Sequence, residues 1–377
     1  MKLKGNIISG QTAGYGEIAT DGNLIVSIKY SGEIQPDADW IVPGFIDTHI
    51  HGIGDGEAIG DGIGIMAKFA PETGMTGFLP TLATSSEEST LQYLQTVRDN
   101  MREQDGSRIL GAHLEGPFLE LAHRGGMDRT QLRTPDAGEV KAWLECAAGV
   151  LKIVTIAPEL AGADTVIRML HDSGIAVSLG HTGMSAEALP AAVDSGISRV
   201  CHLFDAYEGR QVDSGVSQVA LADAVLTDDR LMIELICDGF HVPAGLVRLA
   251  VRAAGVERIV AISDAMPGTG KPDGIYAEAD GRLYKLENAG VCRFVEPPHE
   301  ITGSCLTMNR AFANLIFKFG FSPVEAALMT SCNPARSIGL GDIYGMLTPG
   351  YTADIVVLAN DLTTVKETII NGKKMLG

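Results

Sequence analysis

Residues 43–52 read PGFIDTHIHG, an apolar run that ends in Asp47, His49 and His51. Later apolar runs also end in an acid or a histidine: Glu115 in LGAHLEGPF, His181 in VSLGHT, His202 in VCHLFDAY, His241 in ICDGFH and Asp264 in VAISDAM. Each run is typical of a buried strand. In an eight-stranded α/β barrel the carboxyl ends of all strands lie on one rim, where active sites form. The pattern therefore predicts that these scattered groups meet around one metal ion.

The middle of the chain, residues 44–339, alternates between strand and helix patterns. The candidate strands are Phe45–His49, Gly77–Leu82, Ile109–Leu114, Leu151–Ala157, Ala176–Gly180, Arg199–Leu203, Leu231–Cys237 and Ile259–Ser263. They are continuous apolar runs, as expected of parallel strands buried on both faces. Helical patterns such as Ser86–Gln104 lie between them, and Pro190 is expected near the start or a bend of its helix.

This alternation predicts an α/β protein with a (β/α)8 TIM-type barrel. A doubly wound open sheet is the competing fold. It places its ligand at a single crevice and would not explain reactive residues at so many strand ends.

The two chain ends have a different pattern, with short strands separated by glycine, asparagine and aspartate turns. Asp21-Gly22 and Asn371-Gly372 are hairpin signals, and a further turn is expected near residues 14–16. We therefore expect residues 1–43 and 340–377 to build one small β-sandwich domain, with the barrel at 44–339.

Composition excludes some classes of partner. The formal net charge is −18, which argues against nucleic acid or an anionic membrane as a partner. The cysteines are spread singly without a C-x-x-C pair, which favours reduced thiols and a cytoplasmic location. No apolar stretch reaches about 18 residues and the start of the chain lacks a signal-peptide core, so no membrane span is expected.

Several of these residues suit a metal centre. His49 and His51 are two apart on a strand, so both side chains point to the same side. Imidazole nitrogen and carboxylate oxygen are the usual ligands of zinc, and three protein ligands with an open position are typical of a hydrolytic site. Glu115, His181 and His202 fit that count. The alternatives are packed core histidines and a buried glutamate paired with an arginine.

Asp264 follows the last predicted barrel strand. A carboxylate beside a metal-activated water can accept its proton and later deliver it to a leaving group. The alternative is a helix N-cap, which aspartate often provides. We predict that Asp264 is the general acid and base.

The chain resembles the amidohydrolase superfamily and, within it, the N-acetylglucosamine-6-phosphate deacetylases. The resemblance covers nearly the whole length and rests on PGFIDTHIHG (43–52), HLEGPF (113–118), SLGHT (178–182), CHLFDA (201–206), ELICDGFHV (234–242), ISDAM (262–266), ITGSCLTM (301–308), CNPAR (332–336) and GMLTPGYTADIVVL (345–358). It implies a cytoplasmic homodimeric hydrolase of linear amide bonds that removes the N-acetyl group of N-acetylglucosamine 6-phosphate or N-acetylgalactosamine 6-phosphate.

The resemblance also implies roles for the residues above. A divalent metal, with zinc the expected ion, would be held by Glu115, His181 and His202. His49 and His51 would hold a second ion in members that bind two, with Glu115 as a possible bridge. Asp264 would accept the proton of the metal-bound water and later protonate the sugar amine. His241 would polarise the amide carbonyl and contact the substrate.

The remaining substrate-binding candidates are His123, Asp205, Ala206 and Arg210, and here the chain departs from the family. Members usually carry Asn-Ala after His-Leu-Phe and then an Arg-Glu-Pro-Gly loop that helps bind phosphate. Asp205 replaces a neutral amide, and two unit charges about 5 Å apart repel by about 3 kcal/mol at an effective dielectric near 20. The alternatives are therefore an amidohydrolase for a different N-acyl or cyclic amide substrate without phosphate, and a non-catalytic barrel.

Overall fold

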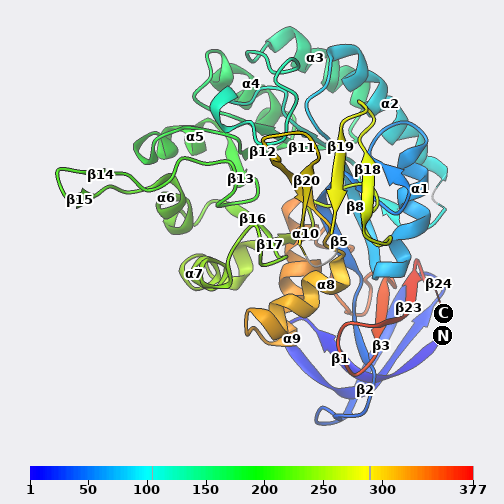
Figure 1. Ribbon diagram of the computed structural model, residues 1–377. Coiled ribbons are helices and arrows are strands. Elements are labelled where there is room, and N and C mark those ends of the chain that lie inside the picture. The colour runs from blue at the N-terminus through cyan, green and yellow to red at the C-terminus, as the bar shows by residue number, and fades with distance from the viewer. Residues whose placement is uncertain (104, 288–289, 377) are drawn as a thin grey trace.

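The computed structural model describes residues 1–103, 105–287 and 290–376. Its centre is a parallel barrel whose strands follow one another in hydrogen-bonding order (Figure 1). The strands are β5 (Phe45–Ile50), β8 (Met75–Leu82), β10 (Ala112–Glu115), β11 (Leu151–Ile156), β12 (Ala176–Leu179), β13 (Ile197–Val200), β16 (Met232–Ile236) and β17 (Ile259–Ile262). Just beyond β17, the amide nitrogen of Asp264 donates to the carbonyl oxygen of His49 at 2.9 Å and brings the last strand beside the first. The predicted barrel is confirmed.

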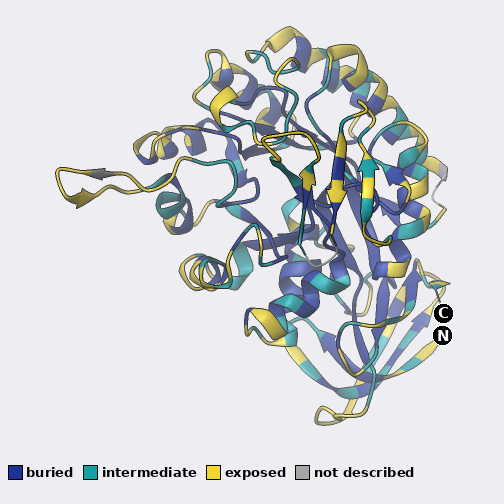
Figure 2. Cartoon of the chain, viewed as in Figure 1, coloured by how far each residue is buried: buried dark blue, intermediate teal, exposed yellow. Residues whose placement is uncertain are grey.

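Helices cover the outside of the barrel. They are α1 (Gly62–Phe69), α2 (Glu87–Glu103), α3 (Ala137–Ala147), α4 (Ala163–Asp172), α5 (Leu189–Ser195), α6 (Leu221–Thr227), α7 (Ala244–Ala254), α8 (Met308–Ala313), α9 (Pro323–Ala327) and α10 (Asn333–Ser337). In α4 the buried residues are Ala163, Val166, Ile167 and Leu170, which is the spacing of one helix face. Figure 2 shows the result, with buried strands inside and helices exposed on their outer faces.

Most expected elements have close counterparts. All the expected barrel strands are present, and Pro190 lies in the first turn of α5 as expected. The expected strand Ile109–Leu114 is interrupted: β9 (Arg108–Ile109) ends before β10 begins. Gly111 lies in the gap with φ +149°, where a Cβ would meet the carbonyl oxygen of Val150 at 2.6 Å. The expected last residue of the second helix, Gln104, lies outside the described residues.

The chain ends form one curled sheet of seven strands. In order, these are β24 (Lys373–Leu376), β23 (Val365–Ile370), β22 (Ile355–Leu358), β4 (Trp40–Pro43), β1 (Lys2–Ser9), β2 (Thr12–Asp21) and β3 (Leu24–Gly32). Leu24 also bridges to Thr352, so the sheet bends toward itself. It encloses a core of its own that includes Ile7, Ile18 and Ile355. The strands of the small domain thus come from both ends, while its exact limits at 43 and 340 stay a prediction.

The expected turn near residues 14–16 is wrong, because β2 runs straight through it. A Cβ at Gly16 would lie 2.4 Å from the carbonyl oxygen of Lys29 in β3. Gly16 therefore allows β2 and β3 to approach closely, at a point where their register shifts.

A single residue, Gly44, separates the end sheet from the barrel, because β4 ends at Pro43 and β5 begins at Phe45. A Cβ on Gly44 would lie 2.1 Å from the Thr76 hydroxyl oxygen, and the Gly44 amide donates to the carbonyl oxygen of Asp354 at 3.0 Å. The first barrel strand is thus fixed directly to the end sheet.

Two additions extend from the strand-end side of the barrel. A four-stranded antiparallel sheet follows β17 and consists of β18 (Gly274–Ala277), β19 (Leu283–Leu286), β20 (Val291–Phe294) and β21 (Ile301–Ser304). A hairpin of β14 (Val212–Asp213) and β15 (Val216–Ser217) projects away from the body in Figure 1. Two short strands, β6 (Gly52–Ile53) and β7 (Gly56–Glu57), follow β5.

Among the described helices, none has the length and apolar character needed to cross a membrane.

Candidate metal centre and active site

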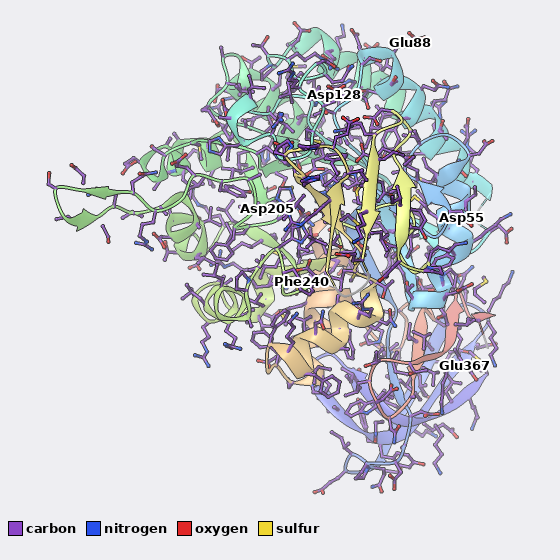
Figure 3. The ribbon with its side chains drawn as sticks, in the orientation of Figure 1. Asp55, Glu88, Asp128, Asp205, Phe240 and Glu367 are labelled. Atoms are coloured by element: carbon purple, nitrogen blue, oxygen red, sulfur yellow. The ribbon has the colours of Figure 1, made fainter. Side chains whose placement is uncertain are left out.

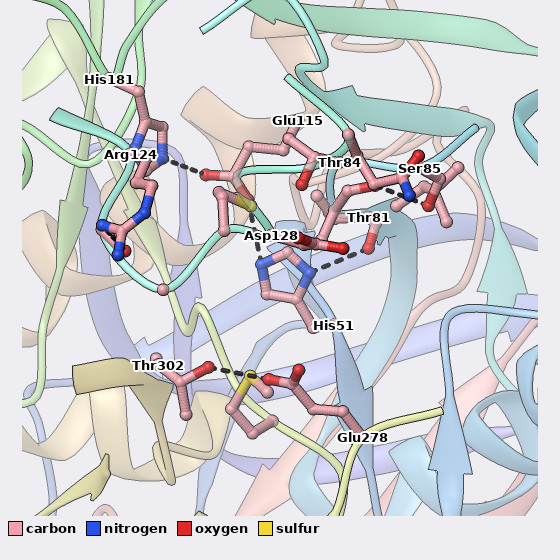
Figure 4. A pocket seen from close by; sticks show the side chains of 18 of the residues that line it. His51, Thr81, Thr84, Ser85, Glu115, Arg124, Asp128, His181, Glu278 and Thr302 are labelled. Atoms are coloured by element: carbon pink, nitrogen blue, oxygen red, sulfur yellow. Dashed lines mark hydrogen bonds and ion pairs between the residues drawn. The ribbon is translucent and has the colours of Figure 1, made fainter. Parts of the chain in front are cut away.

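The carboxylate of Glu115 lies at the point where the strand ends converge. It extends from the last position of β10, and the residue is 1% exposed. One oxygen, Oε1, lies 3.0 Å from Nε2 of His181 and 2.9 Å from Nε2 of His202. The other, Oε2, lies 3.2 Å from Nε2 of His49 and 3.1 Å from Nε2 of His51. Figure 4 shows His51 and His181 directed toward this carboxylate.

The outer ring nitrogens of His51 and His181 hold these two side chains in a defined orientation. Nδ1 of His51 lies 3.0 Å from the carbonyl oxygen of Thr81, and Nδ1 of His181 lies 2.9 Å from that of His123. A carbonyl oxygen can only accept, so each Nδ1 carries a hydrogen and Nε2 is the nitrogen that faces the centre. Histidine ligands of metals are oriented in the same way, by a second partner on the outer nitrogen.

The donor set fits a divalent cation. Nε2 of His49 and Oε2 of Glu115 are buried and lie 3.2 Å apart, but neither makes a well-directed hydrogen bond. Four imidazole nitrogens and one carboxylate are the ligand types that zinc and related ions take, at about 2.0–2.2 Å. Ligand atoms at such distances from one ion lie about 3.4 Å apart in a tetrahedron, close to the separations observed here. The two oxygens of Glu115 divide the histidines into two pairs, so the geometry suits one ion or two.

The pKa shifts of these residues also indicate a site that favours positive charge. Burial alone raises the pKa of Glu115, but the charge on His49 and hydrogen bonds with His181 and His202 hold it well below its usual value. Burial lowers the pKa of His51, yet hydrogen bonds with Asp264 and Glu115 raise it to about 9. The centre therefore stabilises positive charge at the position where these side chains meet.

Asp264 completes this arrangement from the end of β17. Its Oδ1 lies 3.2 Å from Nε2 of His51 and 3.4 Å from Nε2 of His49. Its backbone is left-handed, with φ +52°, and His181 and His202 also have positive φ, at +48° and +20°. Such conformations cost of order 1–3 kcal/mol in residues other than glycine and concentrate at functional sites. The side chains thus turn inward at the expense of local strain.

A buried network that the sequence did not reveal supports the metal centre. Glu234 in β16 accepts from Nε and Nη2 of Arg199 at 2.9 and 2.7 Å, and its other oxygen lies 3.1 Å from Nδ1 of His49. The exposed fractions of Glu234 and Arg199 are 0% and 1%. The sequence did contain a signal for this pair that was not used. Glu234 and Arg199 carry opposite charges inside the apolar runs MIELI and ISRV, and buried charges need partners.

Other polar residues lie beside the centre. Asp47, on the face expected for His49 and His51, accepts from the hydroxyl of Ser263 at 2.5 Å, and burial raises its pKa to about 7. His113 faces the carbonyl oxygen of Thr48 at 3.0 Å, and burial lowers its pKa to about 3, so it is a neutral core group. The Cys201 thiol, which sequence analysis did not single out, lies 3.7 Å from Oε1 of Glu115.

A cavity of about 640 Å³ opens over the centre. Of the substrate-binding candidates, His123, Asp205 and Ala206 line it, whereas Arg210 and His241 are outside its lining. Arg210 is half exposed and its Nη2 lies 2.6 Å from Oδ1 of Asp223. The roles expected of these residues stay predictions.

His241 is held next to the site by its loop. Its Nδ1 lies 2.6 Å from Oδ2 of Asp238, and its Nε2 is buried without a hydrogen-bond partner. Burial lowers the pKa of His241, but the hydrogen bond with Asp238 raises it above its ordinary value. The side chain is therefore a candidate donor through Nε2.

With the fold and the site described, comparison with known proteins identifies the family. The sequence profile of the Amidohydrolase family matches residues 40–375. The chain belongs to the amidohydrolase family. The expected class, a hydrolase of that superfamily, is confirmed.

Several similar proteins are named as deacetylases of N-acetylated amino sugar phosphates. N-acetylglucosamine-6-phosphate deacetylase of Bacillus subtilis (strain 168) is 33% identical over 360 residues, which cover 93% of this chain and 88% of that protein. N-acetylgalactosamine-6-phosphate deacetylase of Escherichia coli O157:H7 is 31% identical and covers 87% of this chain and 86% of its own length. A solved structure of a mutant N-acetyl-D-glucosamine-6-phosphate deacetylase from Mycobacterium smegmatis, in complex with N-acetyl-D-glucosamine-6-phosphate, superposes with a TM-score of 0.89 at 30% identity. The superposition covers 100% of this chain and 99% of the Mycobacterium smegmatis chain.

Proposed function

We propose that this chain is a metal-dependent deacetylase that hydrolyses the acetamide of an N-acetylated amino sugar. The names of the relatives make N-acetylglucosamine 6-phosphate the first substrate, with N-acetylgalactosamine 6-phosphate next. The observation that carries the proposal is the convergence of four histidines on the two oxygens of Glu115. Asp264 lies beside two of them, His49 and His51.

In this proposal Glu115, His181 and His202 hold one divalent ion, with zinc the expected metal. His49 and His51, together with Glu115, would hold a second ion where two bind. A bound divalent ion supplies Lewis acidity and lowers the pKa of a coordinated water toward neutrality.

The remaining chemistry is proton transfer and orientation. Burial raises the pKa of Asp264, but a hydrogen bond with His51 and the charges of His49 and His51 lower it overall, so Oδ1 is ionised and able to take a proton. Asp264 accepts the proton of the attacking water and gives it to the departing amine, which leaves acetate and the free amino sugar. His241 donates from Nε2 to the carbonyl oxygen as negative charge develops there.

Acetate release tests the proposal. Metal-replete protein should release one acetate per N-acetylglucosamine 6-phosphate consumed, and a chelator should stop the reaction until a divalent ion is restored. If metal-replete protein releases no acetate from either phosphorylated sugar while it turns over another N-acyl compound, the proposed substrate is wrong.

A cytoplasmic location and a homodimer belong to the same proposal. All six cysteines are free thiols, which suits a reducing compartment. Light scattering coupled to gel filtration should give twice the 39.8 kDa chain mass. A single-chain mass at micromolar concentration would contradict the dimer.

A further inference from the structure

The thiol of Cys201 lies inside the metal centre. Cys201 directly follows β13 and precedes His202, on the segment that leads to Asp205 in Figure 3, and the residue is 0% exposed. Its Sγ lies 3.7 Å from Oε1 of Glu115 and 3.7 Å from Nδ1 of His49. The sulfur is therefore close to the same carboxylate on which the histidines converge.

The backbone around Cys201 fixes this position. Its amide donates to the carbonyl oxygen of Leu179 at 2.8 Å, and its carbonyl oxygen accepts from the hydroxyl of Tyr207 at 2.5 Å. Side chains two apart along a strand point to the same side, and Arg199 pairs with the buried Glu234 of the neighbouring strand. Cys201 continues this alternation, so its sulfur points into the barrel and not toward the surrounding helices.

The separations between these side chains suit donors that share one ion. Zinc binds sulfur at about 2.3 Å and oxygen at about 2.0–2.2 Å, so a sulfur and an oxygen on one tetrahedral ion lie about 3.5 Å apart. The separation between Sγ of Cys201 and Oε1 of Glu115 is 3.7 Å. Four buried residues each offer a ligand atom, and these atoms all lie within 4.8 Å of one another: His49, Glu115, Cys201 and His202. The thiol thus belongs to one donor group with two histidines and the central carboxylate.

Hydrogen bonds within the protein do not satisfy this donor group. Nε2 of His49 and Oε2 of Glu115 are buried and make no well-directed hydrogen bond. A thiol is a weak donor with a single hydrogen, so Cys201 cannot satisfy both. Burial raises the pKa of the Cys201 thiol, which is therefore neutral until a cation binds, and coordination to a metal removes the proton. A cation would accept lone pairs from the nitrogen, the oxygen and the sulfur together.

From this arrangement we propose that Cys201 coordinates the bound ion through its sulfur, which makes the cofactor a thiophilic divalent ion such as zinc. Thiolate ligands select such ions, whereas carboxylate, carbonyl and water ligands suit magnesium and manganese. The displaced thiol proton passes to solvent. Zinc sites can become five-coordinate, so a sulfur ligand still leaves a position for water. The inference rests on the proposed metal centre and adds a ligand and an ion class to it.

Cobalt(II) tests the proposal, because a thiolate bound to cobalt gives a charge-transfer absorption band in the near ultraviolet that imidazole and carboxylate ligands do not give. Chelator-treated protein with reduced thiols is reloaded with cobalt(II), and elemental analysis measures the bound cobalt. We expect the band in the wild-type protein. In Cys201→Ser the band should disappear while cobalt stays bound through the other ligands.

Cys237→Ser is the matched control. Cys237 is also buried and directly follows the next barrel strand, β16, but its Sγ donates to the carbonyl oxygen of Leu235 at 3.4 Å. Among the described residues, Cys237 belongs to no group that could hold a metal ion, so its variant should keep the band. Ion preference is a second readout. The ratio of cadmium to manganese affinity should fall at least about tenfold in Cys201→Ser and change by less than about twofold in Cys237→Ser.

The outcomes separate this inference from the proposed function. Cobalt-loaded wild-type protein without the band overturns the inference and leaves the proposed function standing. A band that persists in Cys201→Ser, or an unchanged ratio of cadmium to manganese affinity, overturns it as well. Cys201→Ala provides the same comparison if the serine variant does not fold, and the wild-type spectrum is decisive without either. Wild-type protein that binds no divalent ion removes the proposed metal centre, and this inference with it.

Discussion

Replacing Glu234 with glutamine should destabilise the protein strongly, although Glu234 lies beneath the rim. One carboxylate oxygen accepts from Arg199 and the other lies 3.1 Å from Nδ1 of His49. A glutamine keeps the shape and one acceptor, but it leaves the buried guanidinium of Arg199 without a counter-charge. Breaking a buried ion pair from one side costs about 3–5 kcal/mol, so the free energy of unfolding should fall by that amount.

Urea unfolding of chelator-treated protein measures this change without a contribution from metal binding. Glu17→Gln is the matched control, because Glu17 pairs with Lys2 on the exposed surface, where the loss of an ion pair should leave the urea midpoint nearly unchanged. The double variant Arg199→Met with Glu234→Gln should recover part of the loss, since no buried charge is then left alone. A loss below about 1 kcal/mol for Glu234→Gln, or a double variant no more stable than the single one, would refute the reasoning.

Three further outcomes are expected. Asp264→Asn should lower kcat by about 10²–10⁴-fold in the acetate assay, as for loss of a general acid and base, and a kcat within tenfold of the wild type would contradict its role. Glu115→Gln should reduce the metal content measured by elemental analysis to below half that of the wild type, because both oxygens face histidine pairs; unchanged content would place the ion elsewhere. Burial raises the pKa of Asp354 despite Arg108, so the folded state binds its proton more tightly than the unfolded state. Stability should therefore fall, relative to Asp354→Asn, as pH rises above about 4, and urea midpoints that show the opposite trend would exclude this assignment.

The strand ends could be located from sequence because their signal is local. Parallel strands buried on both faces leave long apolar runs, and packing alone rarely places a histidine or an acid at the end of such a run. His49, Glu115 and Asp264 were found in this way, and the barrel topology then brings them together.

The parts that sequence analysis missed depend on contacts between distant segments. Arg199 and Glu234 lie on adjacent strands, but their pairing is visible only once β13 and β16 are known to be neighbours. Helix α1 escaped because Gly62 and Gly64 lower its helix propensity. The strands β18–β21 were missed because they are short and only partly buried, which gives a weak alternation.

The way in which Gly44 joins the two parts of the molecule has a consequence for its tolerance of mutation. His49 lies in β5 and His51 directly follows it, and a single residue separates this strand from the end sheet. Destabilising substitutions in that sheet, far from the proposed metal ligands, should therefore weaken metal binding as well as lower the melting temperature. The end sheet thus supports the first barrel strand, and its distortion would first displace the side chains at the carboxyl ends of the barrel strands.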